Sequence, residues 1–227
     1  MRRTLISRLL RRIASRFHSS SEAQQATFTA IFESNVWGDA ESVSGPGSTQ
    51  ARAADFQQDL MSLVDRLNVG SIVDAPCGDF NWMRGALGPR DLPYTGVDIV
   101  EALIARNSSL YATPNRRFVC MDMTRADLPR ADLIICRDAL VHLSFADARA
   151  AIRNFRRSGA RYLLATTFVN RPRNTDVPTG GWRVLNLERP PFSFPAPLAL
   201  IDERCTHSGG LYRDKRLGLW ELASLDV

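Results

Sequence analysis

The stretch from residue 71 to residue 98 constrains the fold of this 227-residue chain more than any other. It begins with a short, apolar, β-branched run at residues 71–75, which breaks at the Pro-Cys-Gly sequence of residues 76–78. Such a run followed by a turn is typical of a buried parallel strand. A second apolar run, at residues 94–98, ends on Asp98. In a doubly wound sheet this spacing places a carboxylate at the diol of a bound ribose, so two adjacent strand ends are predicted to face one nucleoside-like ligand.

The turn after the first predicted strand helps to identify that ligand. A dinucleotide site presents glycine-rich backbone to a pyrophosphate. Here Pro76 has no N–H to donate, and the carboxylates of Asp74 and Asp79 would repel a diphosphate. The acidic turn therefore suits a cationic, phosphate-free nucleoside such as S-adenosylmethionine (SAM) better than a dinucleotide.

Residues 73–80, Val-Asp-Ala-Pro-Cys-Gly-Asp-Phe, resemble the first motif of the class I SAM-dependent methyltransferases, and Asp98 resembles the acidic residue that closes their second strand. The first and third glycines that are usual in that motif are missing here. The resemblance implies an α/β fold: a Rossmann-like, doubly wound, seven-stranded sheet with flanking helices and an antiparallel last strand. From the motif alone, a plain strand-to-helix connection stays open as an alternative.

The ends of the later strands are predicted to complete a SAM site. A third strand at residues 117–121 leads to Asp122 and Met123. In the resembled family a carboxylate and an apolar neighbour at this place commonly frame the adenine, although an Asp heading a surface turn would look the same. The predicted cofactor-binding residues are Asp74, Ala75, Cys77, Gly78, Trp82, Asp98, Asp122, Met123 and Arg137.

A fourth strand at residues 131–136 leads into the segment where the resembled family places its reaction chemistry. Methyl transfer requires a positioned acceptor and, for an alcohol, removal of its proton. The bases available in this segment are Asp138 and His142, which we predict to be catalytic. A structural role for His142, or packing of its ring against the cofactor, is the alternative.

The acceptor site is predicted to lie in a long irregular segment, residues 170–197, that follows a fifth strand at residues 161–168. Six prolines exclude regular structure over most of this segment. The predicted substrate-binding residues are Asn174, Asp176, Trp182 and Arg183, together with Trp37 from the loop before a helix at residues 50–67. The alternatives are a surface excursion anchored by Phe192 and Phe194, and an ordinary loop around Trp37. Sixth and seventh strands are expected at residues 198–202 and 217–222.

The basic charge of the chain is concentrated in a first segment, residues 1–20, which contains six arginines and no acid. The remaining 23 basic and 24 acidic residues leave a methyltransferase domain at residues 21–227 nearly neutral, so no nucleic-acid partner is expected. Residues 2–17 are predicted to form a basic amphipathic helix that is too short to span a bilayer. It is interpreted as an interfacial membrane anchor, an organelle transit segment or a helix that packs on the domain.

The cysteines help to assign a compartment. The four cysteines, at positions 77, 120, 136 and 205, lack the paired spacing of a zinc site or a disulfide framework. Reduced thiols are the simplest interpretation, so no metal is expected, and the predicted location is cytoplasmic, with peripheral membrane contact through residues 2–17 as an option.

Together these features predict a SAM-dependent methyltransferase acting on a small-molecule or carbohydrate-like acceptor, with oxygen as the expected methylated atom. Two alternatives remain. One is an NAD(P)-linked oxidoreductase, which the acidic, proline-containing turn opposes. The other is a methyltransferase-like domain that is not an enzyme and binds a partner through its N-terminal helix.

Overall fold

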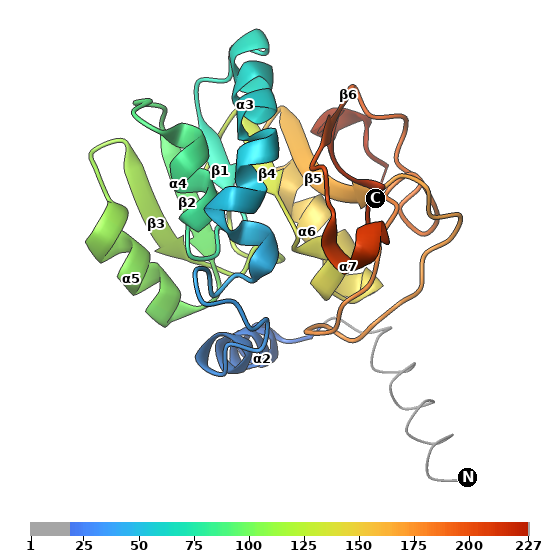
Figure 1. Ribbon diagram of the computed structural model, residues 1–227, viewed down its shortest axis with the longest axis horizontal. Helices are drawn as coiled ribbons and strands as arrows, with labels where there is room; N and C mark the ends of the chain where they lie inside the picture. The colour runs from blue at the N-terminus through green and yellow to red at the C-terminus, as the bar shows by residue number, and fades with distance from the viewer. Residues whose placement is uncertain (1–18, 227) are drawn as a thin grey trace, which may run out of the picture.

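A seven-stranded sheet forms the centre of residues 19–226, the part of the chain that the computed structural model describes (Figure 1). The strands are β1 (Ile72–Asp74), β2 (Tyr94–Asp98), β3 (Arg116–Cys120), β4 (Leu133–Cys136), β5 (Tyr162–Phe168), β6 (Ala199–Asp202) and β7 (Lys215–Glu221). Their order is β3-β2-β1-β4-β5-β7-β6. The first five strands are parallel, and β7 pairs antiparallel with both β5 and β6. The predicted doubly wound fold with an antiparallel last strand is confirmed.

Helices cover both faces of the sheet because successive strand residues point to opposite sides. Along β4, Leu133 and Ile135 pack with α3 (Gln50–Arg66) and α4 (Asn81–Leu87), whereas Ile134 packs with α6 (Phe145–Arg157). The remaining helical elements are α2 (Ser21–Glu33), α5 (Glu101–Tyr111), α7 (His207–Gly210), and the short 3₁₀ turns η1 (Pro46–Ser48), η2 (Leu140–His142) and η3 (Leu222–Ser224). The two apolar layers fix which strand ends reach the same edge of the sheet.

Helix α6 illustrates how the sequence produces this packing. Its Ala148, Ala151, Ile152 and Phe155 recur at helical spacing and are completely buried. The Ser144 hydroxyl caps the helix by accepting a hydrogen bond from the Asp147 backbone N–H at 3.1 Å. The end of β4 and the turn η2 are thereby held against the sheet edge.

The last strand starts two residues earlier than the apolar pattern predicts, at Lys215 rather than at Leu217. Both extra residues are basic, which hides the strand start from a hydrophobicity pattern. Lys215 is nevertheless buried, because its ammonium group pairs with two carboxylates. The other predicted strands and helices are present, with ends that differ by a residue or two.

Helix α2 lies across the edge of the sheet at which the parallel strands end (Figure 1). The Ser20 hydroxyl caps it by accepting from the Ala23 N–H at 3.2 Å. Just before it, the Ser19 N–H and hydroxyl both donate to the Asp147 carboxylate, at 3.1 and 3.0 Å. These hydrogen bonds tie the start of α2 to α6. The predicted basic helix at residues 2–17 lies outside the described residues.

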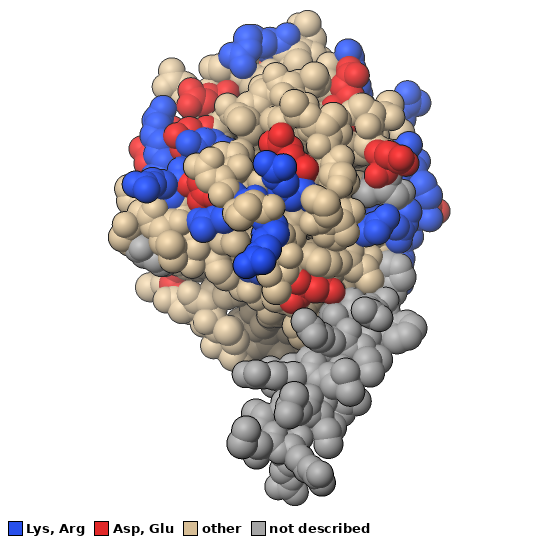
Figure 2. Space-filling model, turned by 90° about the vertical axis from the view of Figure 1, so that its right-hand side faces the viewer, with Lys and Arg blue, Asp and Glu red and all other residues tan. Residues whose placement is uncertain are grey.

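The face formed by β6, β7 and residues 170–197 carries charges of both signs. Figure 2 shows basic and acidic side chains interspersed on this face rather than gathered by sign. Within residues 19–226, none of the helices is both long and apolar enough to cross a bilayer.

Candidate active site

Two cavities adjoin at the edge of the sheet where the parallel strands end. The first lies between α2, the turn after β1 and the ends of β2, β3 and β4. The second lies between residues 45–47, the end of β5, Trp182, residues 203–206 and β7. Together with the open solvent at their mouths, their volumes are about 1030 and 1240 Å³. The residues that line both cavities are Trp37, Ser44, Arg137, Asp138 and His142.

A glycine after β1 lets a distant loop close onto the turn. Gly78 has φ +53°, and a Cβ atom there would lie 2.2 Å from the Ser44 Oγ atom. Ser44 Oγ accepts a hydrogen bond from the Asp79 N–H at 3.0 Å, and the Asp79 carboxylate accepts from the Val43 N–H at 3.0 Å. Residues 43–48 are thus held against the turn, where they form part of the wall of both cavities.

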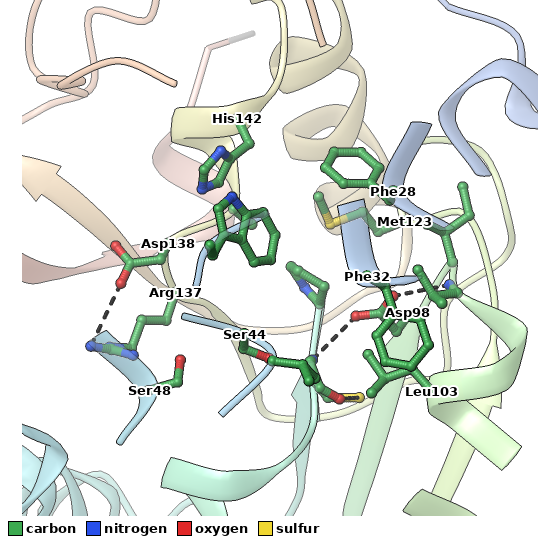
Figure 3. A pocket seen from close by; sticks show the side chains of 18 of the residues that line it. Phe28, Phe32, Ser44, Ser48, Asp98, Leu103, Met123, Arg137, Asp138 and His142 are labelled. Carbon is green, nitrogen blue, oxygen red and sulfur yellow. Dashed lines mark hydrogen bonds and ion pairs between the residues drawn. The ribbon is translucent and has the colours of Figure 1, made fainter. Parts of the chain in front are cut away.

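Asp98 closes β2 inside the first cavity (Figure 3). One carboxylate oxygen accepts from the Gly78 N–H at 3.2 Å, and the other from the Val100 N–H at 3.0 Å. Burial raises the pKa of this carboxyl group to about 6, against the opposing effect of these hydrogen bonds. At neutral pH the group is ionised, and each oxygen can accept one more hydrogen bond.

Apolar side chains form much of the wall of this cavity around Asp98. In Figure 3, Phe28 and Phe32 of α2, Leu103 of α5 and Met123 surround one space. Asp122 lines the same space, and its carboxylate accepts from the Thr124 N–H at 2.8 Å. An apolar slot with a few polar groups at its ends is the usual form of a site for a flat heteroaromatic ring.

His142 stands where the two cavities meet. Its Nδ1 atom lies 2.8 Å from the Gly181 carbonyl oxygen, which can only accept, so Nδ1 carries a proton and Nε2 of the neutral ring is an acceptor. Burial lowers the pKa of His142, and the hydrogen bond to Gly181 and the charge of Asp138 offset this only in part. Its ring centroid is 5.0 Å from that of Trp37. A neutral imidazole in this tautomer is a ready proton acceptor at neutral pH.

Asp138 is held as an anion. Its Oδ2 atom is 2.5 Å from Lys215 Nζ and 3.6 Å from Arg137 Nη2, the latter contact being drawn in Figure 3. Burial alone would raise the pKa of Asp138, but the charges of Lys215 and Arg137 outweigh burial and lower it to about 2. A carboxylate with so low a pKa is a weak proton acceptor, so its main effect on the site is its negative charge.

Comparison with known proteins identifies this arrangement. Residues 72–160, from β1 to the end of α6, match the family model described as a methyltransferase domain. The fold is similar to the solved structure of the magnesium protoporphyrin IX methyltransferase ChlM from Synechocystis PCC 6803 with bound SAM. That match has a TM-score of 0.55 and 17% sequence identity, and covers 89% of this chain and 97% of the other. Residues 72–160 are thus similar to a methyltransferase domain, and the fold is that of the class I SAM-dependent methyltransferases.

Other solved structures resemble this chain over a smaller part of its length. The N-methyltransferase NodS from Bradyrhizobium japonicum WM9, in complex with S-adenosylhomocysteine (SAH), matches with a TM-score of 0.49 and 15% identity, over 61% of this chain and 73% of the other. The matched part spans only 64% of the bacterial CtHen1 methyltransferase domain, at TM-score 0.44 and 15% identity over 49% of this chain. At such identities a structural likeness shows the fold alone. A comparison with the curated proteins found no match.

The structure brings most of the predicted cofactor residues together. Those that line the first cavity are Cys77, Gly78, Trp82, Asp98, Asp122, Met123 and Arg137. Asp74 and Ala75 are not among the lining residues and are completely buried. The Asp74 carboxylate accepts from the Tyr94 hydroxyl at 2.8 Å, and burial raises the pKa of Asp74 to about 7.

Three of the predicted substrate residues brace the long loop and line neither cavity. Asn174 bonds to the backbone of residues 186–190, and Asp176 accepts from the Phe145 N–H at 2.7 Å. Arg183 donates to the carbonyl oxygens of Val141 and Leu143, at 3.1 and 2.6 Å. These bonds fasten residues 170–197 to the segment that carries His142. The other two predicted substrate residues, Trp37 and Trp182, line the second cavity.

Sequence reasoning missed the part that α2 has in the first cavity. Gln24 is 2% exposed and lines the first cavity, and its amide nitrogen Nε2 has no hydrogen-bond partner among residues 19–226. Phe28 and Phe32 belong to the same wall. The available signal was a polar residue on the apolar side of an amphipathic helix. It was too weak to use, because the pattern does not say which ligand, if any, the apolar side faces.

Proposed function

We propose that this methyltransferase transfers the methyl group of SAM to an oxygen atom of a small-molecule or carbohydrate-like acceptor. In this proposal SAM occupies the first cavity and the acceptor the second. The observation that carries it is the neutral imidazole of His142 at the junction, with Nδ1 bound to a carbonyl oxygen and Nε2 left to accept a proton. A reaction in which an alcohol must lose a proton needs a base at that point.

The residues of the first cavity fit SAM chemically. The Asp98 carboxylate suits the two ribose hydroxyls, because both its oxygens keep accepting capacity. The apolar slot of Phe28, Phe32 and Met123 suits the adenine ring, with Asp122 as acceptor for its amino group. The unpartnered amide of Gln24 supplies a further hydrogen-bond donor toward the cofactor.

The chain's own contribution to the chemistry is orientation and proton removal. Bound SAM supplies an electrophilic methyl group and departs as a neutral thioether, so no acid is needed for the leaving group. His142 Nε2 takes the acceptor hydroxyl proton as the new oxygen–carbon bond forms. The Gly181 carbonyl holds the ring in the required tautomer. The resulting imidazolium ion is stabilised by the charge of Asp138, for which we propose this role in place of proton removal because its pKa is low.

Two measurements test the proposal. Isothermal titration should show binding of SAM and SAH but not of NAD. The purified protein is then incubated with SAM and a small-molecule cell extract, and mass spectrometry searches for products heavier by one CH₂ unit. The expected products are methyl ethers that form with the wild type and fall sharply with His142→Ala. Products methylated only at nitrogen would refute transfer to oxygen.

A further inference from the structure

One lysine, Lys215, lies in the second cavity. Of 29 lysine and arginine residues, Lys215 is the only lysine. Its side chain is 10% exposed and lines the second cavity, with Nζ 2.5 Å from Asp138 Oδ2 and 3.1 Å from Glu203 Oε2. An ammonium group is compact and has three rotatable donors, whereas a guanidinium group is broad and planar. The other 28 of these residues are arginines, so Lys215 gives the second cavity a small, tetrahedral donor instead of a guanidinium group.

The charged side chains that line the second cavity around Lys215 balance one another. This group is called the wall below. Arg137 donates to Glu203 Oε2 from Nε at 2.9 Å and from Nη2 at 2.6 Å. With Lys215 and Asp138 these residues form a network of two cations and two anions, whose side chains range from 2% to 31% exposed. A charged acceptor group would therefore find no uncompensated opposite charge on this wall. The network favours a neutral, polar acceptor.

Two hydrogen-bonding positions of the network remain open. Glu203 Oε2 accepts two hydrogen bonds from Arg137 and lies 3.1 Å from Lys215 Nζ, whereas Glu203 Oε1 is buried without a hydrogen-bond partner among the described residues. A buried carboxylate oxygen without a partner is costly, which marks it as a place for a donor. Lys215 Nζ donates one hydrogen bond to Asp138 and forms an ion pair with Glu203, which leaves donor capacity on its three N–H groups. The wall thus offers one acceptor and one donor side by side.

We propose that Glu203 and Lys215 recognise two neighbouring hydroxyl groups on a ring of the acceptor, an inference that rests on the proposed function. One hydroxyl donates to Glu203 Oε1, and its neighbour accepts from Lys215 Nζ. An ammonium group would have several donors and only one open acceptor oxygen, and a carboxylate or phosphate would face the Glu203 charge. A vicinal diol matches both open positions.

Aromatic side chains at the same cavity supply a surface for the ring itself. Trp182 is 47% exposed, and its ring centroid lies 5.2 Å from that of Tyr212, which also lines the cavity. Such rings pack against the apolar face of a saturated sugar or against another aromatic ring. The shared chemistry is a ring diol, which a carbohydrate or an aromatic diol would present.

The test measures binding of simple ring diols to the full chain saturated with SAH. The probes are methyl α-D-glucopyranoside for a sugar and catechol for an aromatic diol, with cyclohexanol and phenol as matched single-hydroxyl controls. Dissociation constants come from ligand-observed NMR titrations. We expect at least one diol to bind about tenfold or more tightly than its control, and the diol that does so tells the two sources apart.

Variants then assign the effect to the two residues. Lys215→Arg keeps the charge but replaces the compact donor, and Glu203→Gln keeps the shape. With its carbonyl facing Arg137 and Lys215, the glutamine would put an NH₂ group where Oε1 stands. Each variant should weaken diol binding about tenfold or more. The control Arg161→Met, at an exposed residue just before β5 and outside both cavities, should not.

The affinity for SAH separates the possible failures. Unchanged SAH affinity in the variants shows that they are folded and that the first cavity is intact. Equal binding of diols and single-hydroxyl controls to the wild type, or undiminished diol binding by both folded variants, would overturn the inference. Failure of the wild type to bind SAH would instead refute the proposed function.

Discussion

The two cavities hold their carboxylates in different ways. In the first, Asp98 is held by the backbone N–H groups of Gly78 and Val100, at the ends of two neighbouring strands. In the second, Asp138 and Glu203 are held mainly by the side chains of buried cations. A group fixed by backbone keeps its place when nearby side chains change, whereas each member of a side-chain network depends on the others.

This difference has an energetic meaning. Substitutions in the first cavity should change SAM affinity one residue at a time, because their contacts are separate. Substitutions in the second should be coupled, because the residues share partners. The first cavity is thus suited to binding one fixed ligand. In the second cavity, substitution of a few residues would change which acceptor is bound.

The largest effect is expected at the junction of the two cavities. Replacing His142 by alanine should lower turnover by ~10²–10⁴ because the acceptor proton loses its base, while SAM affinity stays the same. Steady-state kinetics on the identified acceptor, with titration of SAM, checks both. Asp138→Asn is the matched comparison, and it should slow turnover less because it removes a charge rather than the base. Undiminished turnover of His142→Ala would remove the base assignment.

The next effect concerns the stability of the fold. It is expected at Asp74, which is buried and does not line the first cavity. The pKa of Asp74 is raised from 3.8 to about 7 by burial, so the folded state binds its proton more tightly than the unfolded state. Its contribution to stability is complete below pH 4 and is lost as pH rises through 7, by up to about 4 kcal/mol. Asp74→Asn, which stays neutral, should be more stable than wild type at pH 8 but not at pH 4. Denaturant unfolding at both pH values checks this, and parallel pH profiles would contradict it.

Asp98 tests the cofactor side alone. Asp98→Ala should weaken SAM binding by ~1.5–3 kcal/mol, because hydrogen bonds to a charged acceptor are lost. In the wild type, SAM affinity should fall as pH drops below about 6, where the Asp98 carboxylate takes up a proton. Titration calorimetry between pH 5 and pH 8 measures both effects. A variant that binds SAM as tightly as wild type would remove Asp98 from the site.

The smallest effect is expected at α2. Gln24→Leu should weaken SAM binding by ~0.5–1.5 kcal/mol and leave stability unchanged or higher, because Gln24 Nε2 has no protein partner to lose among residues 19–226. The neighbouring Gln25→Leu is the control. Gln25 Nε2 donates to the Ile99 carbonyl oxygen at 3.3 Å, and the residue does not line the first cavity. If both variants bind SAM alike, the proposed role of Gln24 fails.

Local signals explain how much of the fold and the first cavity was predictable. Short stretches of consecutive residues are enough to predict the apolar strands, the turn at Gly78 and the carboxylate at Asp98. The order of the strands follows from the family resemblance. The second cavity joins Trp37, Glu203 and Lys215, which are far apart in sequence. No periodicity links such positions.

The long loop shows the same limit from the other side. Its polar residues were predicted to face an acceptor, but Asn174, Asp176 and Arg183 instead satisfy backbone groups. An irregular segment without ladder hydrogen bonds needs such partners for its own backbone and for the segments that it covers. The sequence shows that a polar side chain is present in the loop. It does not show whether that side chain faces a ligand or hydrogen-bonds to backbone groups.

The clamp between Ser44 and Asp79 has a thermodynamic consequence. Residues 43–48 are fastened to the turn after β1 and contribute to the walls of both cavities. Any displacement of this shared wall by one ligand changes the free energy of binding the other, and by linkage the change is equal in both directions. An acceptor that raises the affinity for SAM by some factor must have its own affinity raised by SAM by that same factor. The order in which the two ligands arrive can then favour one route without altering the stability of the ternary complex.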